Sequence, residues 1–348
     1  MDLQTETFDL ETRHPFRIAR SRRAPLRNVF LSLTDDGATG LGEASPAEYY
    51  GESAAGVVNR IAVARTWLQS VKLRSKADIH RAWNACWEYV APSRAAQCAI
   101  DLALWDWLAQ REGVSVTELA LGKKPAAVTT FGTIGLSSID ELPIRISELE
   151  SFDAIKIKSD QNADLDLIEQ IRAGFAGTLA VDANGAWEHA DLSELCRRLA
   201  ALRVTFIEQP FPPGQDSALD ELHLVLPVFA DESCVTEEDV DTLPPGYAGF
   251  NIKLVKCGGL TPALRMARRG RERGRQTLVG CMLESSVLIA AGCVVAQKTD
   301  FADLDGAWLL AHDPAHGWMM DRGRLQPPST AGLGVSRPVP AELAEASA

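Results

Sequence analysis

The chain has 348 residues, enough for about two domains, one of them large. Its 35 Lys and Arg residues against 47 Asp and Glu residues give a net charge of −12, which disfavours nucleic acid and anionic membranes as partners and favours a small molecule. The seven cysteines form no CxxC pair, and the longest apolar stretch is far below the roughly 20 residues of a membrane span. We therefore expect a cytoplasmic globular protein, and a homo-oligomer is compatible with this sequence.

Residues 1–124 have the mixed pattern of an α+β module. An alternating run over residues 28–33, followed by the turn Asp35-Asp36-Gly37, predicts antiparallel strands. Residues 93–111 begin with a capping Ser, carry apolar residues at helical spacing and precede a Gly, so they predict a helix.

Beyond residue 124, short apolar runs alternate with helix-length polar stretches. Runs of this kind are typical of parallel strands buried on both faces. Eight of them predict an α/β fold, a TIM-type (β/α)8 barrel over residues 125–316 with its chemistry at the carboxyl ends of the strands. The tail, residues 317–348, is expected to pack back on the α+β module and complete it as a capping domain. The eight runs are VTTFGTIGL, AIKIKSD, LAVDANG, FIEQPF, VFADES, GFNIKLVK, TLVGCML and FADLDG.

Charged residues end the second to sixth runs at intervals of 23 to 26 residues. This interval is about one βα unit, so successive strands should deliver their charged groups to the same end of the barrel. The residues are Lys156, Lys158, Asp182, Glu208, Asp231 and Lys256.

The three acids in this set predict a metal site. Neighbouring strands lie ~4.8 Å apart, so Asp182, Glu208 and Asp231 would form a cluster that is costly without a cation. A set of oxygen ligands without His or Cys selects a hard ion, Mg²⁺ first and Mn²⁺ second. The alternative is that each acid caps a helix or forms a surface ion pair.

The lysines predict acid–base chemistry. Strands two and six lie across a barrel from each other, so Lys158 and Lys256 would face the two sides of one substrate carbon. Burial and a nearby cation lower the pKa of a lysine, as a general base requires, and Lys156 would add positive charge. The alternative is that the lysines only neutralise metal ligands. Lys253 falls on the opposite face from Lys256 by strand alternation, and we assign it no role.

A second pair of acids ends the eighth run. Asp303 and Asp305 are two residues apart and share one strand face, opposite the strand that carries Glu208. Two carboxylates without an obvious second ion would suit a substrate ammonium group. The alternative is a pair that caps a loop.

Five motifs, in order and spacing, resemble those of the muconate lactonizing enzyme subgroup of the enolase superfamily. The resemblance implies that Mg²⁺ and a lysine base together remove a proton next to a carboxylate. The motifs are KIK at 156–158, VDANG at 181–185, IEQP at 207–210, ADES at 230–233 and IKLVKCGG at 252–259.

Within the subgroup, the Asp303-x-Asp305 segment resembles dipeptide epimerases, whose two aspartates hold the α-ammonium of the N-terminal residue. Residues 15–23 resemble the capping-domain loop in which an arginine of L-Ala-D/L-Glu epimerases binds the substrate's side-chain carboxylate. Arg23 is the first candidate for this arginine and Arg20 the second. By the same resemblance, the pocket should be lined by Thr133, Cys281, Met282 and Leu283.

The resemblance thus implies epimerisation of L-Ala-L-Glu in murein peptide turnover (peptidoglycan recycling), with proton transfer by Lys158 and Lys256. Other dipeptides are an alternative, as are the cycloisomerase, o-succinylbenzoate synthase and N-acylamino acid racemase reactions of the subgroup. The substrates of those three carry no ammonium group, so Asp303 and Asp305 argue against them. A metal-binding protein without activity is a further alternative, which the intact lysine pair disfavours.

Overall fold

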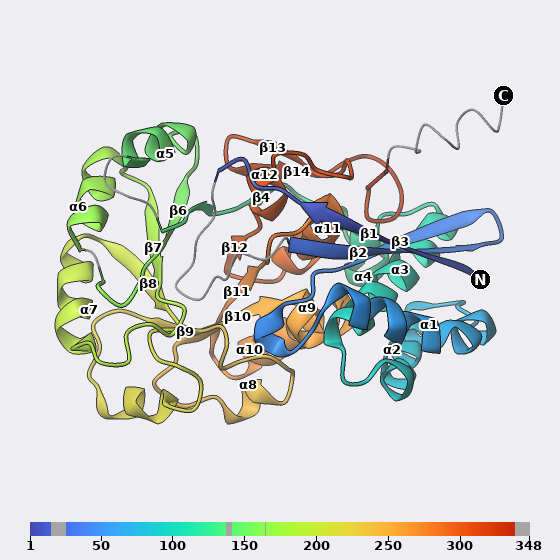
Figure 1. Ribbon diagram of the computed structural model, residues 1–348, viewed down its shortest axis with the longest axis horizontal. Helices are drawn as coiled ribbons and strands as arrows, with labels where there is room; N and C mark the ends of the chain where they lie inside the picture. The colour runs from blue at the N-terminus through green and yellow to red at the C-terminus, as the bar shows by residue number, and fades with distance from the viewer. Residues whose placement is uncertain (15–25, 137–140, 164, 338–348) are drawn as a thin grey trace.

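The computed structural model describes residues 1–14, 26–136, 141–163 and 165–337. A barrel and a smaller capping region lie side by side, and the C-terminal segment runs along both (Figure 1). None of the described helices is both long and apolar enough to cross a membrane.

The capping region is an antiparallel sheet covered on one face by helices. The helix predicted over 93–111 is α3, whose side-chain cap is Ser93 and whose C-cap is Gly113. Its close approach to the sheet depends on glycine, because a Cβ atom on Gly42 would lie 1.9 Å from the carbonyl oxygen of Ala99. The elements are β1 (Asp2–Leu10), β2 (Leu26–Asp35), β3 (Ala38–Ala44), η1 (Glu48–Tyr50), α1 (Ala54–Ser70), α2 (Lys76–Val90), α3 (Arg94–Glu112) and α4 (Val116–Leu121).

Eight parallel strands of the described chain form the barrel sheet, and strands adjacent in sequence are adjacent in space. The last strand returns to the first, since Phe131 N donates to Ala302 O at 2.9 Å and Leu304 N donates to Thr130 Oγ1 at 2.7 Å. The strands are β5 (Gly132–Ile134), β6 (Ala154–Lys158), β7 (Thr178–Asp182), β8 (Val204–Glu208), β9 (Val228–Ala230), β10 (Gly249–Lys253), β11 (Gln276–Gly280) and β12 (Phe301–Asp303).

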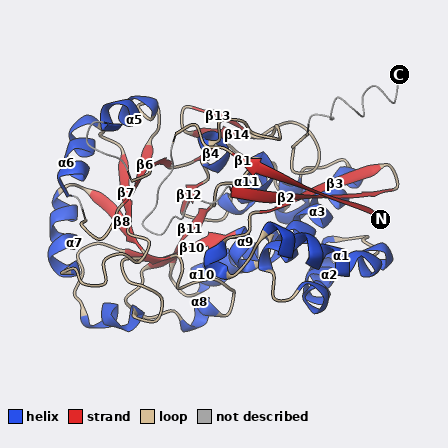
Figure 2. Ribbon diagram, in the orientation of Figure 1, coloured by secondary structure: helices blue, strands red, loops and turns tan. Residues whose placement is uncertain are grey.

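Helices surround these strands, as Figure 2 shows most clearly for α5, α6 and α7. Inside the barrel, Phe206 and Phe229 stack with ring centroids 4.4 Å apart and fill the space below the mouth. The helices are α5 (Leu142–Glu148), α6 (Leu165–Gly174), α7 (Leu192–Ala201), η3 (Asp216–Glu221), α8 (Asp239–Thr242), α9 (Leu254–Cys257), α10 (Leu260–Glu272), α11 (Ser286–Ala296) and α12 (Gly306–Leu309).

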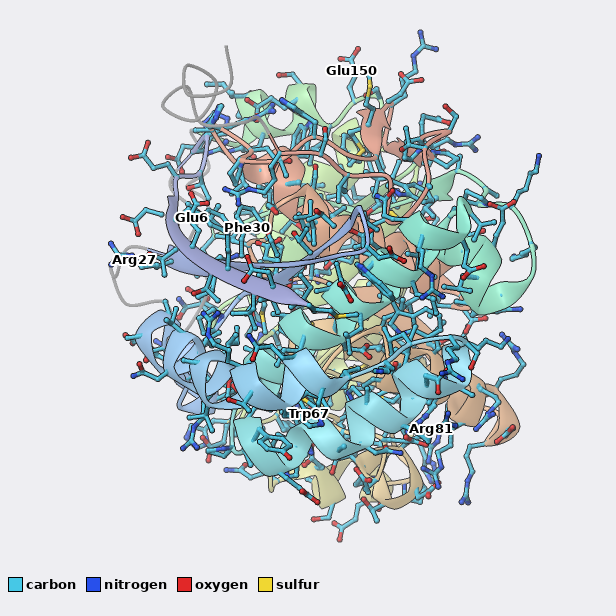
Figure 3. All side chains as sticks on the ribbon, turned by 90° about the vertical axis from the view of Figure 1, so that its right-hand side faces the viewer. Glu6, Arg27, Phe30, Trp67, Arg81 and Glu150 are labelled. Carbon is cyan, nitrogen blue, oxygen red and sulfur yellow. The ribbon has the colours of Figure 1, made fainter. Side chains whose placement is uncertain are left out.

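The C-terminal segment binds to both regions. β14 (Arg324–Gln326) pairs with β13 (Met319–Asp321) and with β4 (Val128–Thr129), which is the first part of the run predicted as one strand. Farther along, Arg337 pairs with Glu6 and stacks on Phe30, two cross-strand neighbours of the capping sheet (Figure 3). The predicted fold class, a TIM-type barrel with an α+β capping region completed by the tail, is confirmed; the boundaries at 124 and 316 stay predictions.

Two glycines fix the contact between the barrel and α3. A Cβ atom on Gly258 would lie 2.6 Å from Gln97 Oε1, and one on Gly259 would lie 2.5 Å from Asp101 Oδ2. Both glycines have positive φ, which L side chains rarely adopt. This turn directly follows α9 and lies six residues or fewer beyond the end of β10.

Candidate metal and proton-transfer site

Asp182, Glu208 and Asp231 meet at the barrel mouth. Asp182 and Glu208 are the last residues of β7 and β8, and Asp231 directly follows β9. All three are buried, and their ligand oxygens lie within 4.8 Å of one another. A compact set of carboxylate oxygens fits a hard divalent cation such as Mg²⁺, with Mn²⁺ as second choice. The predicted metal triad is confirmed.

The electrostatics of the triad favour a bound cation. Burial and the charge of Asp182 raise the pKa of Glu208 to about 7. Burial also acts to raise the pKa of Asp231, but Lys253 and Lys256 hold it well below its usual range. Three carboxylates this close repel one another, so additional positive charge stabilises them all.

The two lysines of β6 contact different parts of this cluster. Lys156 Nζ is fully buried at the centre, bonded to Asp303 and lying 3.2 Å from Glu208 Oε2. Burial acts to lower the pKa of Lys156, but the surrounding carboxylates raise it well above its ordinary value. Lys158 Nζ lies at the edge of the cluster, 2.5 Å from Asp182 Oδ2.

The sixth strand differs from the prediction. β10 ends at Lys253, and α9 begins at Leu254, so Lys256 is a helical residue and does not end the strand. Lys253 faces the site, with Nζ 2.8 Å from Asp231 Oδ2. Asn251, two residues earlier on the same face, donates from Nδ2 to Glu208 Oε1 at 2.7 Å. The expectation that Lys253 points away from the site is therefore wrong.

Lys256 is held by fixed oxygens of the protein. Its Nζ contacts Asp231 Oδ1 at 2.6 Å and three backbone carbonyls at 2.5 to 3.2 Å, including that of Cys234. An amine bonded to this many oxygens of the protein is fixed in place and is poorly placed to reach a substrate. The contacts favour a structural role for Lys256.

Asp303 and Asp305 both reach Thr133, though not from one strand face as predicted. β12 ends at Asp303, and Asp305 is the N-terminal cap residue of α12. Thr133 N donates to Asp305 Oδ2 at 2.6 Å, and Thr133 Oγ1 lies 3.4 Å from Asp303 Oδ1. Burial and the charge of Asp303 raise the pKa of Asp305 to about 7. A substrate ammonium group would relieve this repulsion.

The remaining predicted residues divide into two groups. Cys281, Met282 and Leu283 form the turn after β11, and the carbonyl of Leu283 accepts hydrogen bonds from Asn28 and Ser45 of the capping region. Arg20 and Arg23 lie outside the described residues.

Sequence reasoning missed Lys253, Asn251 and Tyr50. Alternation of polar residues within the sixth run could have identified the first two, since residues 249, 251 and 253 share one face. Burial and the charge of Asp231 raise the pKa of Tyr50, partly offset by Lys253, which indicates that η1 of the capping region lies near the site. Only the docking of the two regions reveals this residue.

Two domain families match almost the whole chain. Residues 3–122 match the mandelate racemase / muconate lactonizing enzyme N-terminal domain, and residues 144–337 match the enolase C-terminal domain-like family. The chain belongs to the enolase superfamily.

Its similar relatives within this superfamily are dipeptide epimerases. The chain is 36% identical to the hydrophobic dipeptide epimerase of Roseobacter litoralis, over 96% of this chain and 98% of the relative. It is 35% identical to the L-Ala-D/L-Glu epimerase of Escherichia coli, over 92% and 97%.

A solved structure gives the same result. The dipeptide epimerase from Methylococcus capsulatus, complexed with Mg and the dipeptide L-Arg-D-Lys, matches with a TM-score of 0.87 at 32% identity, covering 96% of this chain and 98% of the other. The family, the isomerase class and the Mg²⁺-type cofactor predicted from the sequence are confirmed. These relatives act on different dipeptides, so similarity at this level does not assign a substrate.

Proposed function

We propose that this enzyme epimerises dipeptides by a 1,1-proton transfer at the α-carbon of the C-terminal residue, with L-Ala-L-Glu as the first candidate substrate. The observation that supports this most strongly is the order of groups around the mouth. Lys158 pairs with Asp182 at one side of the metal triad, and Lys253 pairs with Asp231 at the other. A ligand bound to a cation in the triad would therefore have one amine on each side.

The triad would hold Mg²⁺, which when bound supplies positive charge to the substrate carboxylate and stabilises the enolate. Lys158 then accepts the α-proton from one face, and the C–H electron pair moves toward the carboxylate. Lys253, as an ammonium, donates a proton to the opposite face, and the configuration inverts. For the reverse reaction the two lysines exchange roles.

Lys253 needs a lowered proton affinity to act as a base. In its present surroundings burial acts to lower its pKa, but Asp231 and Glu208 raise it well above the ordinary value. Positive charge on the same carboxylates would oppose that effect. Lys156 would remain an ammonium throughout and contribute charge without transferring a proton.

The other end of the dipeptide would bind to the carboxylates across the mouth. Asp303 and Asp305 would hold the α-ammonium group of the N-terminal residue, beside Thr133. Arg23, with Arg20 as second candidate, would bind the side-chain carboxylate of a C-terminal Glu. With that substrate, the setting would be the recycling of peptidoglycan peptides in the cytoplasm.

Proton exchange in D₂O tests this proposal. Incubation of L-Ala-L-Glu with the protein and Mg²⁺ should place deuterium at the glutamate α-carbon and form L-Ala-D-Glu, which NMR and chiral chromatography detect. Failure of a broad dipeptide panel to exchange or epimerise would overturn the assignment. Exchange of N-acylamino acids instead of dipeptides would favour the racemase reaction of the same family.

A further inference from the structure

A cavity of about 150 Å³ opens beside the barrel mouth, where the capping region meets the barrel. Its walls come from four places: residues 12–14 beyond β1, the end of β5, helix α5 and helix α12. The lining includes Thr133, so the cavity is continuous with the site described above. No step of the proposed proton transfer uses this cavity.

The cavity lies next to the group that would hold the substrate ammonium. Thr133 lines the cavity and donates its N–H to Asp305 at 2.6 Å. Trp308, which forms another wall, follows Asp305 by three residues and therefore lies about one helical turn away. In a dipeptide, the carbon that carries the ammonium group also carries the N-terminal side chain. That side chain therefore starts within reach of the cavity.

Arg13 is fixed in the wall of this cavity. The backbone N–H of Arg13 donates to Leu309 O at 2.9 Å, and its side-chain Nε donates to Leu310 O at 2.9 Å. Its guanidinium also lies over the Trp308 ring, 5.5 Å from the centroid. These contacts tie Arg13 to the end of α12, the helix whose N-terminal cap residue is Asp305.

The charged side chains that line the cavity include more positive groups than negative ones. Glu148 lies 2.7 Å from His14 Nε2 and 3.5 Å from Arg145 Nη1. Within the described residues, Arg13 pairs with no carboxylate, and its terminal Nη groups make no hydrogen bond. A guanidinium with two available Nη groups is suited to bind a carboxylate.

We propose that this cavity binds the side chain of the substrate's N-terminal residue and selects an acidic one, Glu or Asp, through Arg13. The inference rests on the proposed dipeptide epimerase function and extends it to the substrate class. A lysine or arginine side chain would meet the unpaired guanidinium and be disfavoured. An N-terminal alanine, as in L-Ala-L-Glu, would still bind through its ammonium group but would leave most of the cavity unfilled, so such a dipeptide would be a substrate with a lower kcat/KM than one with an acidic N-terminal residue.

A series of dipeptides with one C-terminal residue tests the selection. We compare kcat/KM for L-Glu-L-Ala, L-Gln-L-Ala, L-Ala-L-Ala and L-Lys-L-Ala, measured by deuterium exchange at the C-terminal α-carbon. Glu and Gln side chains have the same shape, so the ratio of kcat/KM between these two dipeptides isolates the effect of charge. We expect a ratio of about ten in favour of Glu, the effect of one charge-assisted hydrogen bond, with Lys the poorest substrate.

Variants assign the preference to Arg13. In Arg13→Gln the Glu-to-Gln ratio should fall to about one, mainly through KM, and Arg13→Lys should restore part of it. The matched control is Arg81→Gln, a change on the outer side of α2 (Figure 3), which should leave the ratio unchanged.

The outcomes separate the two proposals. The role of this cavity is overturned if the wild-type ratio of kcat/KM for Glu over Gln is near one, or if the ratio persists in Arg13→Gln. Exchange with any dipeptide would still uphold the epimerase function. Absence of exchange with every dipeptide overturns both.

Discussion

The buried carboxylates at the barrel mouth and those on α3 have different partners. At the barrel mouth, Asp182 and Asp231 contact the ammonium groups of Lys158 and Lys253. On α3, Asp101 accepts from the N–H and Oγ1 of Thr261, and Asp106 accepts from the N–H groups of Leu41 and Leu333. Both sets are almost completely shielded from solvent.

The kind of partner distinguishes carboxylates that can take part in a reaction from carboxylates that hold the fold together. Backbone amides are neutral and fixed, so Asp101 and Asp106 join the helix to distant segments and cannot exchange their partners. Burial raises the pKa of Asp101 to about 7 and that of Asp106 to about 6, because amides compensate a charge only partly. Lysines are charged and can release a proton. A cation can also take their place beside a carboxylate.

The largest expected effect concerns the lysines. Lys158→Ala and Lys253→Ala should each reduce kcat/KM for epimerisation by about 10³, because general acid–base groups contribute roughly 10²–10⁴. Each variant should retain exchange only with the stereoisomer whose proton faces the remaining lysine. Lys256→Met should instead lower stability by about 3–5 kcal/mol, since Asp231 and three carbonyls lose a buried donor.

Kinetics and urea unfolding of the three variants check this assignment. A folded Lys256→Met protein that has lost exchange, together with an active Lys253→Ala protein, would restore Lys256 as the proton-transferring lysine.

Metal removal tests the carboxylates at the barrel mouth separately from those on α3. Chelation should abolish exchange, yet the protein should stay folded, because Lys156, Lys158 and Lys253 already contact the carboxylates of the triad. Mg²⁺ at a hundred times its Kd should add about 2.7 kcal/mol to the free energy of unfolding. Circular dichroism and calorimetry with and without EDTA measure both effects. Exchange that survives complete chelation would contradict a role for the metal.

The amide-bound acids predict a smaller, pH-dependent effect. The pKa of Asp101 is about 7 in the folded protein and near 4 in an unfolded chain, so between these values only the folded state keeps the proton. The stabilising contribution is complete below pH ~4 and is lost as the pH rises toward 7. Relative to Asp101→Asn, the wild type should therefore lose about 2 kcal/mol between pH 5 and 7.5.

Urea unfolding at the two pH values tests this shift. The control is Asp78→Asn, because hydrogen bonds from Arg74 and Ser75 lower the pKa of the Asp78 carboxyl and place its titration below this window. A difference between wild type and Asp101→Asn that does not change with pH would contradict the expectation.

The sequence allowed the barrel and its metal triad to be predicted, because apolar runs and strand-end acids at regular intervals depend on local pattern and on the geometry of βα units. The sixth strand was predicted too long, since LVK continues an apolar run in sequence although α9 starts at Leu254. Arg13 and Tyr50 could not be found this way. Arg13 is held by a hydrogen bond to Leu310, and Tyr50 lies near Asp231; both partners are more than a hundred positions away in the sequence.

The turn at Gly258 and Gly259 places a limit on recombination between relatives. The strand that ends at Lys253 is continuous, through one short helix, with a turn that tolerates no side chain against Gln97 and Asp101. A chimera that took its N-terminal half from another enzyme would need a matching surface at these two positions. Otherwise the turn would shift, and the amine of Lys253 would move with it.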